Sequence, residues 1–93
     1  MANLKIWTID EFLEECEKLC RNQYTYDYSN MPDGICNGHK VGAYQDSWHS
    51  IVIDNGVCTM ALINDKYPNG NSTYIVGDKR MTALEYVRYE LEQ

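Results

Sequence analysis

The residues best suited to chemistry are four cysteines and two histidines spread along the chain. Cys36 and His39 are separated by two residues, and Gly38 between them would let the backbone turn tightly around an ion. Cys16 and Cys20 supply two further soft ligands. Thiolates and imidazoles are the groups that close tetrahedral zinc sites, so Cys16, Cys20, Cys36 and His39 form one candidate metal set.

A second interpretation of these cysteines needs no metal. Cys16 and Cys20 share the helical periodicity of Phe12, Leu13 and Leu19, and a free cysteine behaves as a small buried hydrophobe. Zinc ligands usually come from a tight turn rather than from the middle of a helix. The pattern therefore favours thiols that pack in the core, and we expect no bound cofactor. Zinc remains the alternative.

Thiol catalysis is a further alternative. Cys36 is the candidate nucleophile, because a thiolate needs a nearby base and a group that orients the base. The spacing allows His39 or His49 as the base, with Asp33 or Asp46 behind it. No nucleophile motif surrounds Cys36, and a short chain leaves little room for an oxyanion hole and a substrate cleft. We therefore expect no enzyme.

Two surface features are candidates for binding a partner. Tyr24, Tyr26 and Tyr28 alternate along a predicted strand, and tyrosine is enriched at protein interfaces. The rings could instead pack across strands, and a stacking platform for nucleic acid would need positive charge nearby. The second feature is a run of carboxylates in the first predicted helix: Glu14, Glu15 and Glu17. This run is either a solvated face or a contact for a basic protein.

The helices have the clearest sequence signals. Thr8 and Glu11 form a capping box, with Trp7 and Phe12 as the flanking hydrophobic staple, and this predicts a helix from Ile9 to Arg21. Thr82-Ala83-Leu84-Glu85 repeats the box, with Met81 and Tyr86 as its staple pair. Leu84, Val87 and Leu91 continue at helical spacing, which predicts a second helix over 83–92.

Alternating residues between the helices predict a sheet. Asn55-Gly56 predicts a two-residue hairpin turn between strands over 48–54 and 57–63. The expected pairs are Ile53 with Cys58, Ile51 with Met60, His49 with Leu62 and Asp54 with Val57. This register buries Cys58 and leaves His49 at the edge of the core. Further strands are expected over 4–7, 24–28, 39–44 and 72–76, with turns at 31–34 and 67–71.

These elements predict one α+β domain over residues 1–93. An N-terminal helix, a four- to five-stranded mainly antiparallel sheet and a C-terminal helix follow one another, with both helices on one sheet face. An edge strand of that sheet could pair with a copy of itself, so a monomer and a homodimer both stay open.

Composition excludes several classes of function. The chain has 8 Lys and Arg against 14 Asp and Glu, a formal net charge of −6, so it is no basic reader of nucleic acid. It has no apolar run long enough to span a membrane and no secretory signal. We expect a cytoplasmic protein with free thiols.

The leading functional hypothesis is a small non-enzymatic protein-interaction module whose partner is another protein with a basic surface. Its most concrete form is an inhibitor encoded by a phage or mobile element, anti-CRISPR-like or a similar anti-defence protein, that binds a basic nucleic-acid-handling enzyme. Size, acidity and tyrosine content are the reasons for this hypothesis, and no motif supports it directly.

Overall fold

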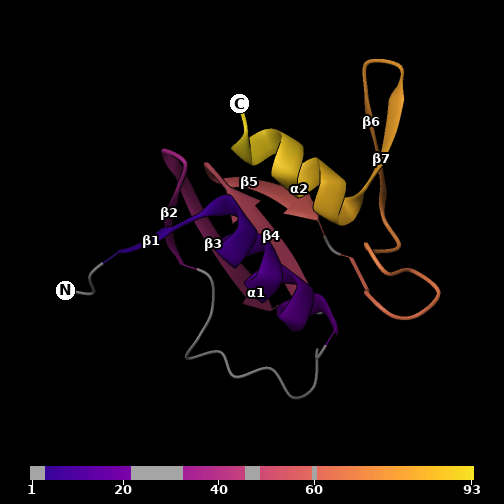
Figure 1. Ribbon diagram of the computed structural model, residues 1–93, viewed down its shortest axis with the longest axis horizontal. Helices are drawn as coiled ribbons and strands as arrows, with labels where there is room; N and C mark the ends of the chain where they lie inside the picture. The colour runs from indigo at the N-terminus through magenta and orange to yellow at the C-terminus, as the bar shows by residue number, and fades with distance from the viewer. Residues whose placement is uncertain (1–3, 22–32, 46–48, 60) are drawn as a thin grey trace.

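The computed structural model describes residues 4–21, 33–45, 49–59 and 61–93, which form an α+β fold (Figure 1). The predicted tyrosine strand over 24–28 and the predicted turn at 31–32 lie outside the described residues, as do Asp46, Trp48 and Met60. The elements in chain order are β1 (Lys5–Trp7), α1 (Ile9–Arg21), β2 (Gly34–Cys36), β3 (His39–Gln45), β4 (His49–Ile53), β5 (Gly56–Thr59), β6 (Thr73–Val76), β7 (Lys79–Thr82) and α2 (Ala83–Leu91).

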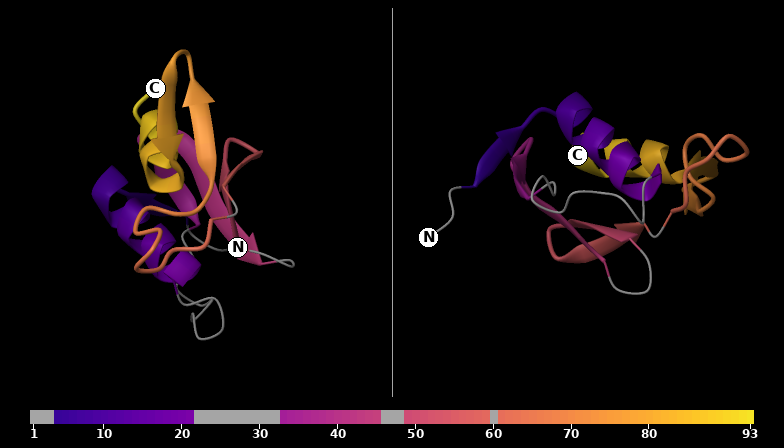
Figure 2. Two further views of the ribbon diagram at one scale, coloured as in Figure 1. Left: turned by 90° about the vertical axis from the view of Figure 1, so that its right-hand side faces the viewer. Right: turned by 90° about the horizontal axis from the view of Figure 1, so that it is seen from below.

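Strands β1 to β5 form one sheet in the order β1-β2-β3-β4-β5, and β6 and β7 form a separate hairpin. β1 runs parallel to β2 because α1 connects them, and the other neighbours are antiparallel. Both helices lie on the same face of the five-stranded sheet (Figure 2). The predicted fold class is therefore confirmed, including the mainly antiparallel sheet. No helix in the described part of the chain is both long and apolar enough to cross a membrane.

The first helix begins and ends where its sequence predicts. The Thr8 amide donates to Glu11 Oε1 and the Glu11 amide donates to Thr8 Oγ1, each at 3.1 Å, so the capping box is formed. The rings of Trp7 and Phe12 meet edge to face with centroids 6.2 Å apart, which is the predicted staple. The second capping box, at Thr82 and Glu85, is also formed. Both helix starts are thus held by local side-chain contacts.

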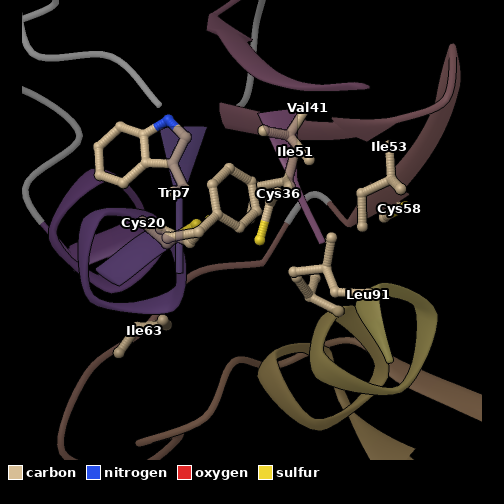
Figure 3. Close-up of a cluster of buried hydrophobic side chains, with 12 residues drawn as sticks. Trp7, Cys20, Cys36, Val41, Ile51, Ile53, Cys58, Ile63 and Leu91 are labelled. Carbon is tan, nitrogen blue, oxygen red and sulfur yellow. The ribbon is translucent and has the colours of Figure 1, made fainter. Parts of the chain in front are cut away.

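The core lies between the helices and the sheet (Figure 3). Phe12, Cys16 and Leu19 of α1 are fully buried, and so are Val87 and Leu91 of α2. The sheet contributes apolar side chains from its inner face: Cys36, Val41, Ile51, Ile53 and Cys58.

The predicted pairing of the β4–β5 hairpin was wrong, because its turn lies one residue earlier in the chain than predicted. The turn residues are Asp54 and Asn55, with φ of 51° and 70°, so Ile53 pairs with Gly56 rather than with Cys58. Asp and Asn tolerate positive φ, and a two-residue turn of this kind needs it at both positions. A bulge then leaves Cys58 as an extra residue between two paired ones, and its side chain is still buried, as expected.

The predicted strand over 57–63 was too long, because β5 ends at Thr59. A strand over 57–63 would place Leu62 on the same face as the buried Cys58, and Ala61 and Ile63 on the other face. In the structure Ala61 and Ile63 are buried and Leu62 is half-buried. The Ile63 amide donates to the Cys20 carbonyl at 3.3 Å, and the Leu62 amide donates to Asn71 Oδ1 at 3.0 Å. The backbone here is bonded to the end of α1 and to a loop instead of to a neighbouring strand.

Two strands were absent from the sequence prediction. β2 pairs with β3 across Asn37-Gly38, and β6 pairs with β7 across Gly77-Asp78. Both dipeptides are hairpin-turn signals of the kind recognised at Asn55-Gly56. The sequence therefore held the evidence for β2 and β7, although each strand is too short to show a periodicity.

The β6–β7 hairpin stands away from the five-stranded sheet (Figures 1 and 2). It is fixed to α2 by the ring of Tyr74, which stacks on Tyr86 with centroids 4.2 Å apart and planes 5° apart. A two-stranded hairpin is only marginally stable alone, so this stacked pair supports its position.

At Gly34, β2 approaches β1 so closely that there is no room for a side chain. A Cβ added to Gly34 would lie 2.0 Å from the Lys5 carbonyl oxygen, and its φ is +145°. We expect Gly34→Ala to lower the free energy of unfolding by at least about 3 kcal/mol, measured by urea denaturation.

Gly38→Ala is the matched control for this substitution. Gly38 also has positive φ, +84°, but an added Cβ would meet nothing within 4 Å. Only backbone strain remains, so the loss should be about 1 kcal/mol. Equal losses for the two variants would contradict the close β1–β2 approach.

Candidate functional site

The four cysteines lie in the core as free thiols. Burial raises the pKa of Cys20 to about 12 and that of Cys58 to about 11. The pKa values of Cys16 and Cys36 are raised by the same cause. A raised pKa keeps a thiol protonated at neutral pH, which is the opposite of what a nucleophile requires.

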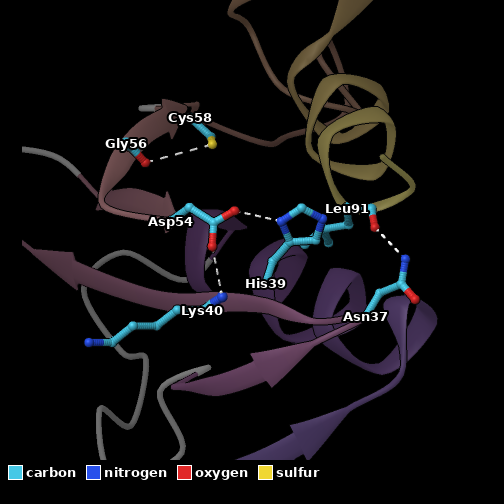
Figure 4. Close-up of polar contacts among 7 residues, drawn as sticks. All are labelled: Asn37, His39, Lys40, Asp54, Gly56, Cys58 and Leu91. Carbon is cyan, nitrogen blue, oxygen red and sulfur yellow. Dashed lines mark hydrogen bonds and ion pairs between the residues drawn. The ribbon is translucent and has the colours of Figure 1, made fainter.

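The Cys36-Asn37-Gly38-His39 segment is the β2–β3 hairpin turn. Asn37 and Gly38 are the turn residues, with φ of 49° and 84°. Cys36 is fully buried, whereas the ring of His39 extends to Asp54, with Nδ1 2.6 Å from Oδ2 (Figure 4). His39 is thus paired with a carboxylate from the neighbouring hairpin.

This turn also closes the end of α2. Asn37 Nδ2 donates to the Leu91 carbonyl at 2.7 Å, and the carbonyls of a last helical turn have no partner within the helix (Figure 4). Asp54 accepts from the Lys40 amide at 3.0 Å in addition to its contact with His39. A protonated imidazole near a helix C-terminus is favourable. The polar groups that sequence spacing associated with chemistry therefore join two hairpin turns to a helix end.

No metal centre is assembled from the candidate ligands. Within the described ranges, which include Cys16, Cys20, Cys36 and His39, no group of three or more His, Cys, Asp or Glu side chains could hold an ion. Of the alternative catalytic partners, Asp33 is exposed and Asp46 is outside the description. His49 lies in β4, but its side chain is not described.

The carboxylates Glu14, Glu15 and Glu17 lie on α1, and each has an intramolecular partner. Lys18 Nζ lies 3.7 Å from Glu14 and 3.0 Å from Glu15, and Arg21 lies 3.1 Å from Glu17. The side chains of Glu14 and Glu17 are 67% and 44% exposed, whereas the side chain of Glu15 is only 16% exposed. Exposed ion pairs contribute little to stability, so Glu14 and Glu17 can exchange these partners for another protein's cations.

A groove of about 700 Å³ runs beside this face. α2 packs against α1 on one side and against β7 on the other, so it forms the base between them. The apolar lining comes from Leu13, Met81 and Leu84. Glu14 and Glu17 stand on the α1 wall, and Lys79 and Arg80 on the β7 wall.

Sequence reasoning found only the acidic wall of this groove. Lys79 and Arg80 are adjacent in the chain, but no sequence-based prediction gave them a role. The Gly77-Asp78 turn signal would have placed the pair on a hairpin strand, but only the packing of that hairpin on α2 brings it opposite α1. The tyrosines Tyr24, Tyr26 and Tyr28 lie outside the described residues.

No protein-family model, curated protein or solved structure matches this chain.

Burial predicts slow reaction of all four thiols in the folded protein. We expect alkylation by iodoacetamide near pH 8 to be at least about tenfold slower in buffer than in urea at each cysteine, because the thiolate is both scarce and enclosed. Peptide mass spectrometry would give the four rates. Selective labelling of Cys36 below neutral pH would contradict its packing role and favour the nucleophile.

The His39–Asp54 pair predicts a pH dependence of stability. The hydrogen bond to Asp54 raises the pKa of His39 above its ordinary value of 6.5. The folded state therefore holds this proton more tightly, so the stabilisation is complete below pH 6.5 and is lost as pH rises through the raised pKa. Urea unfolding between about pH 5.5 and 8.5 measures this loss.

Asp54→Asn is the informative variant, because Asn tolerates the positive φ of the turn and still offers an oxygen to the Lys40 amide. It should show a flatter stability curve over this range. The contact with His39 also lowers the pKa of Asp54 below 3.8, so its contribution is present above pH 3.8 and falls as pH drops through the folded value. Identical pH slopes in the two proteins would refute the pair's contribution.

Proposed function

We propose that this protein is a non-enzymatic interaction domain that binds a partner protein with a basic surface. The contact is made by Glu14 and Glu17 of α1, with the mostly buried Glu15 beside them, and by the adjoining groove. The observation that carries the proposal is the groove itself, which combines apolar side chains with carboxylates from both helices. These carboxylates outnumber the cations of the lining: Asp10, Glu14, Glu17, Glu85 and Glu92 against Lys79, Arg80 and Arg88. Apolar surface with charged margins is the usual composition of a protein-binding site.

The location of the reactive side chains supports the same proposal. The four thiols pack in the core and His39 joins two turns to the end of α2, so their positions already have a structural explanation. The sharpest form of the proposal is an anti-defence inhibitor, anti-CRISPR-like or similar, from a phage or mobile element. Its partner would be a nucleic-acid-handling enzyme in the cytoplasm, whose basic groove the carboxylates of α1 would occupy. Tyr24, Tyr26 and Tyr28 are the proposed second contact.

Charge-neutralising variants test the α1 face. The wild-type protein and Glu14→Gln/Glu17→Gln would be immobilised and exposed to lysate of the source cell, and retained proteins quantified by mass spectrometry. We expect one basic partner whose retention falls about three- to tenfold in the variant, because each charged contact at an interface margin contributes little alone. Retention by the wild type should also fall between about 0.05 and 0.3 M salt.

Asp33→Asn/Asp65→Asn is the matched control, since it removes the same charge from exposed positions outside this groove. Retention by this control should equal that of the wild type. Binding that is independent of salt, or lost equally in both variants, would count against the α1 face as the contact.

A further inference from the structure

The groove has walls of opposite charge. Glu14 and Glu17 of α1 form the acidic wall, and Lys79 and Arg80 of β7 form the basic wall. α2, which contacts both α1 and β7, lies between the two walls. It adds Glu85, Arg88 and Glu92 to the base of the groove, where Arg88 is paired with Asp10 at 2.7 Å. One molecule thus presents both carboxylates and cations that could pair with those of a second copy.

The charges of the basic wall are not satisfied within the molecule. Neither Lys79 nor Arg80 has an ion-pair partner in the part of the chain that the structure describes. On the opposite wall, Glu14 lies 3.7 Å from Lys18 and is two-thirds exposed. Both cations are exposed and solvated, so they are free to pair with carboxylates, and this chain has 14 Asp and Glu.

We infer that the groove binds the groove of a second copy of this chain, across a two-fold axis that runs along the groove. Rotation about that axis exchanges the walls, so the acidic wall of each copy faces the basic wall of the other. A two-fold axis across the groove would place like charges together. Charge therefore selects one of the two symmetric arrangements.

The β6–β7 hairpin supplies the projecting surface that a concave groove needs in its partner. It stands away from the sheet beside α2 (Figures 1 and 2). Arg80 pairs with Ile75 across the hairpin, and paired residues share a face. Ile75 is 69% exposed, so the face that carries Arg80 offers apolar area as well as charge. Each hairpin would pack beside α1 of the other copy.

This inference concerns the chain alone and does not depend on the proposed function. The two are connected, because a basic partner that occupies Glu14 and Glu17 would compete with the second copy for the acidic wall.

A charge-exchange experiment tests the pairing of the walls. Sedimentation velocity would be measured for the wild type, for Glu14→Lys/Glu17→Lys, for Lys79→Glu/Arg80→Glu, and for an equimolar mixture of the two variants. About 0.15 M salt screens the repulsion between two copies of charge −6 while leaving contacts at short range. Circular dichroism would confirm that each variant is folded.

The wild type should form a dimer. Each variant alone should dimerise at least about tenfold more weakly, because both its walls carry one sign, and the mixture should form a heterodimer of near wild-type affinity. The controls Asp33→Lys/Asp65→Lys and Lys40→Glu/Lys66→Glu change the same charges elsewhere and should dimerise as the wild type does. A monomeric wild type, a dimer that neither variant weakens, or a mixture that stays monomeric would overturn the inference.

Discussion

Burial of one apolar layer between the sheet and the two helices is the interaction on which the rest of the structure depends. A chain of this length has a single core, so both amphipathic helices bury their apolar sides against the same face of the sheet. Phe12, Cys16 and Val87 are fully excluded from solvent there. Because the four cysteines belong to that layer, their thiols stabilise the fold by packing and are withdrawn from solution chemistry.

Two tight turns determine the positions of the polar side chains Asn37, His39 and Asp54. Asn37-Gly38 and Asp54-Asn55 are hairpin turns with positive φ. Asn37 donates to the Leu91 carbonyl at the end of α2, and Asp54 bonds to His39 and to the Lys40 amide. His39 and Asp54 resemble part of a catalytic pair, but their hydrogen bond joins the two hairpins. These contacts form a polar junction between the two turns and the end of α2.

The groove exists because the chain builds a second, smaller sheet. β6 and β7 do not extend the five-stranded sheet but stand beside α2, held by the stacked rings of Tyr74 and Tyr86. Lys79 and Arg80 are thereby brought opposite an acidic helix, with apolar and charged side chains of α2 between them. Both the proposed partner contact and the inferred pairing of two copies depend on this placement.

Local signals in the sequence determined the helices, their capping boxes and the α+β class, because these depend on contacts between residues a few positions apart. Thr8 with Glu11, and Trp7 with Phe12, are such contacts. The acidic face of α1 was predictable for the same reason. Short strands carry less information: β2 and β7 have three and four residues, and only their turn dipeptides indicated them.

Tertiary structure decided the hairpin register, the parallel β1–β2 pair and the groove. Asp54 became a turn residue because its carboxylate bonds to His39 and Lys40, which are distant in sequence. Lys79 and Arg80 face the carboxylates of α1 only because the hairpin packs on α2. Contacts of this kind join segments whose relative positions depend on the whole core. They therefore cannot be predicted from the spacing of residues along the chain.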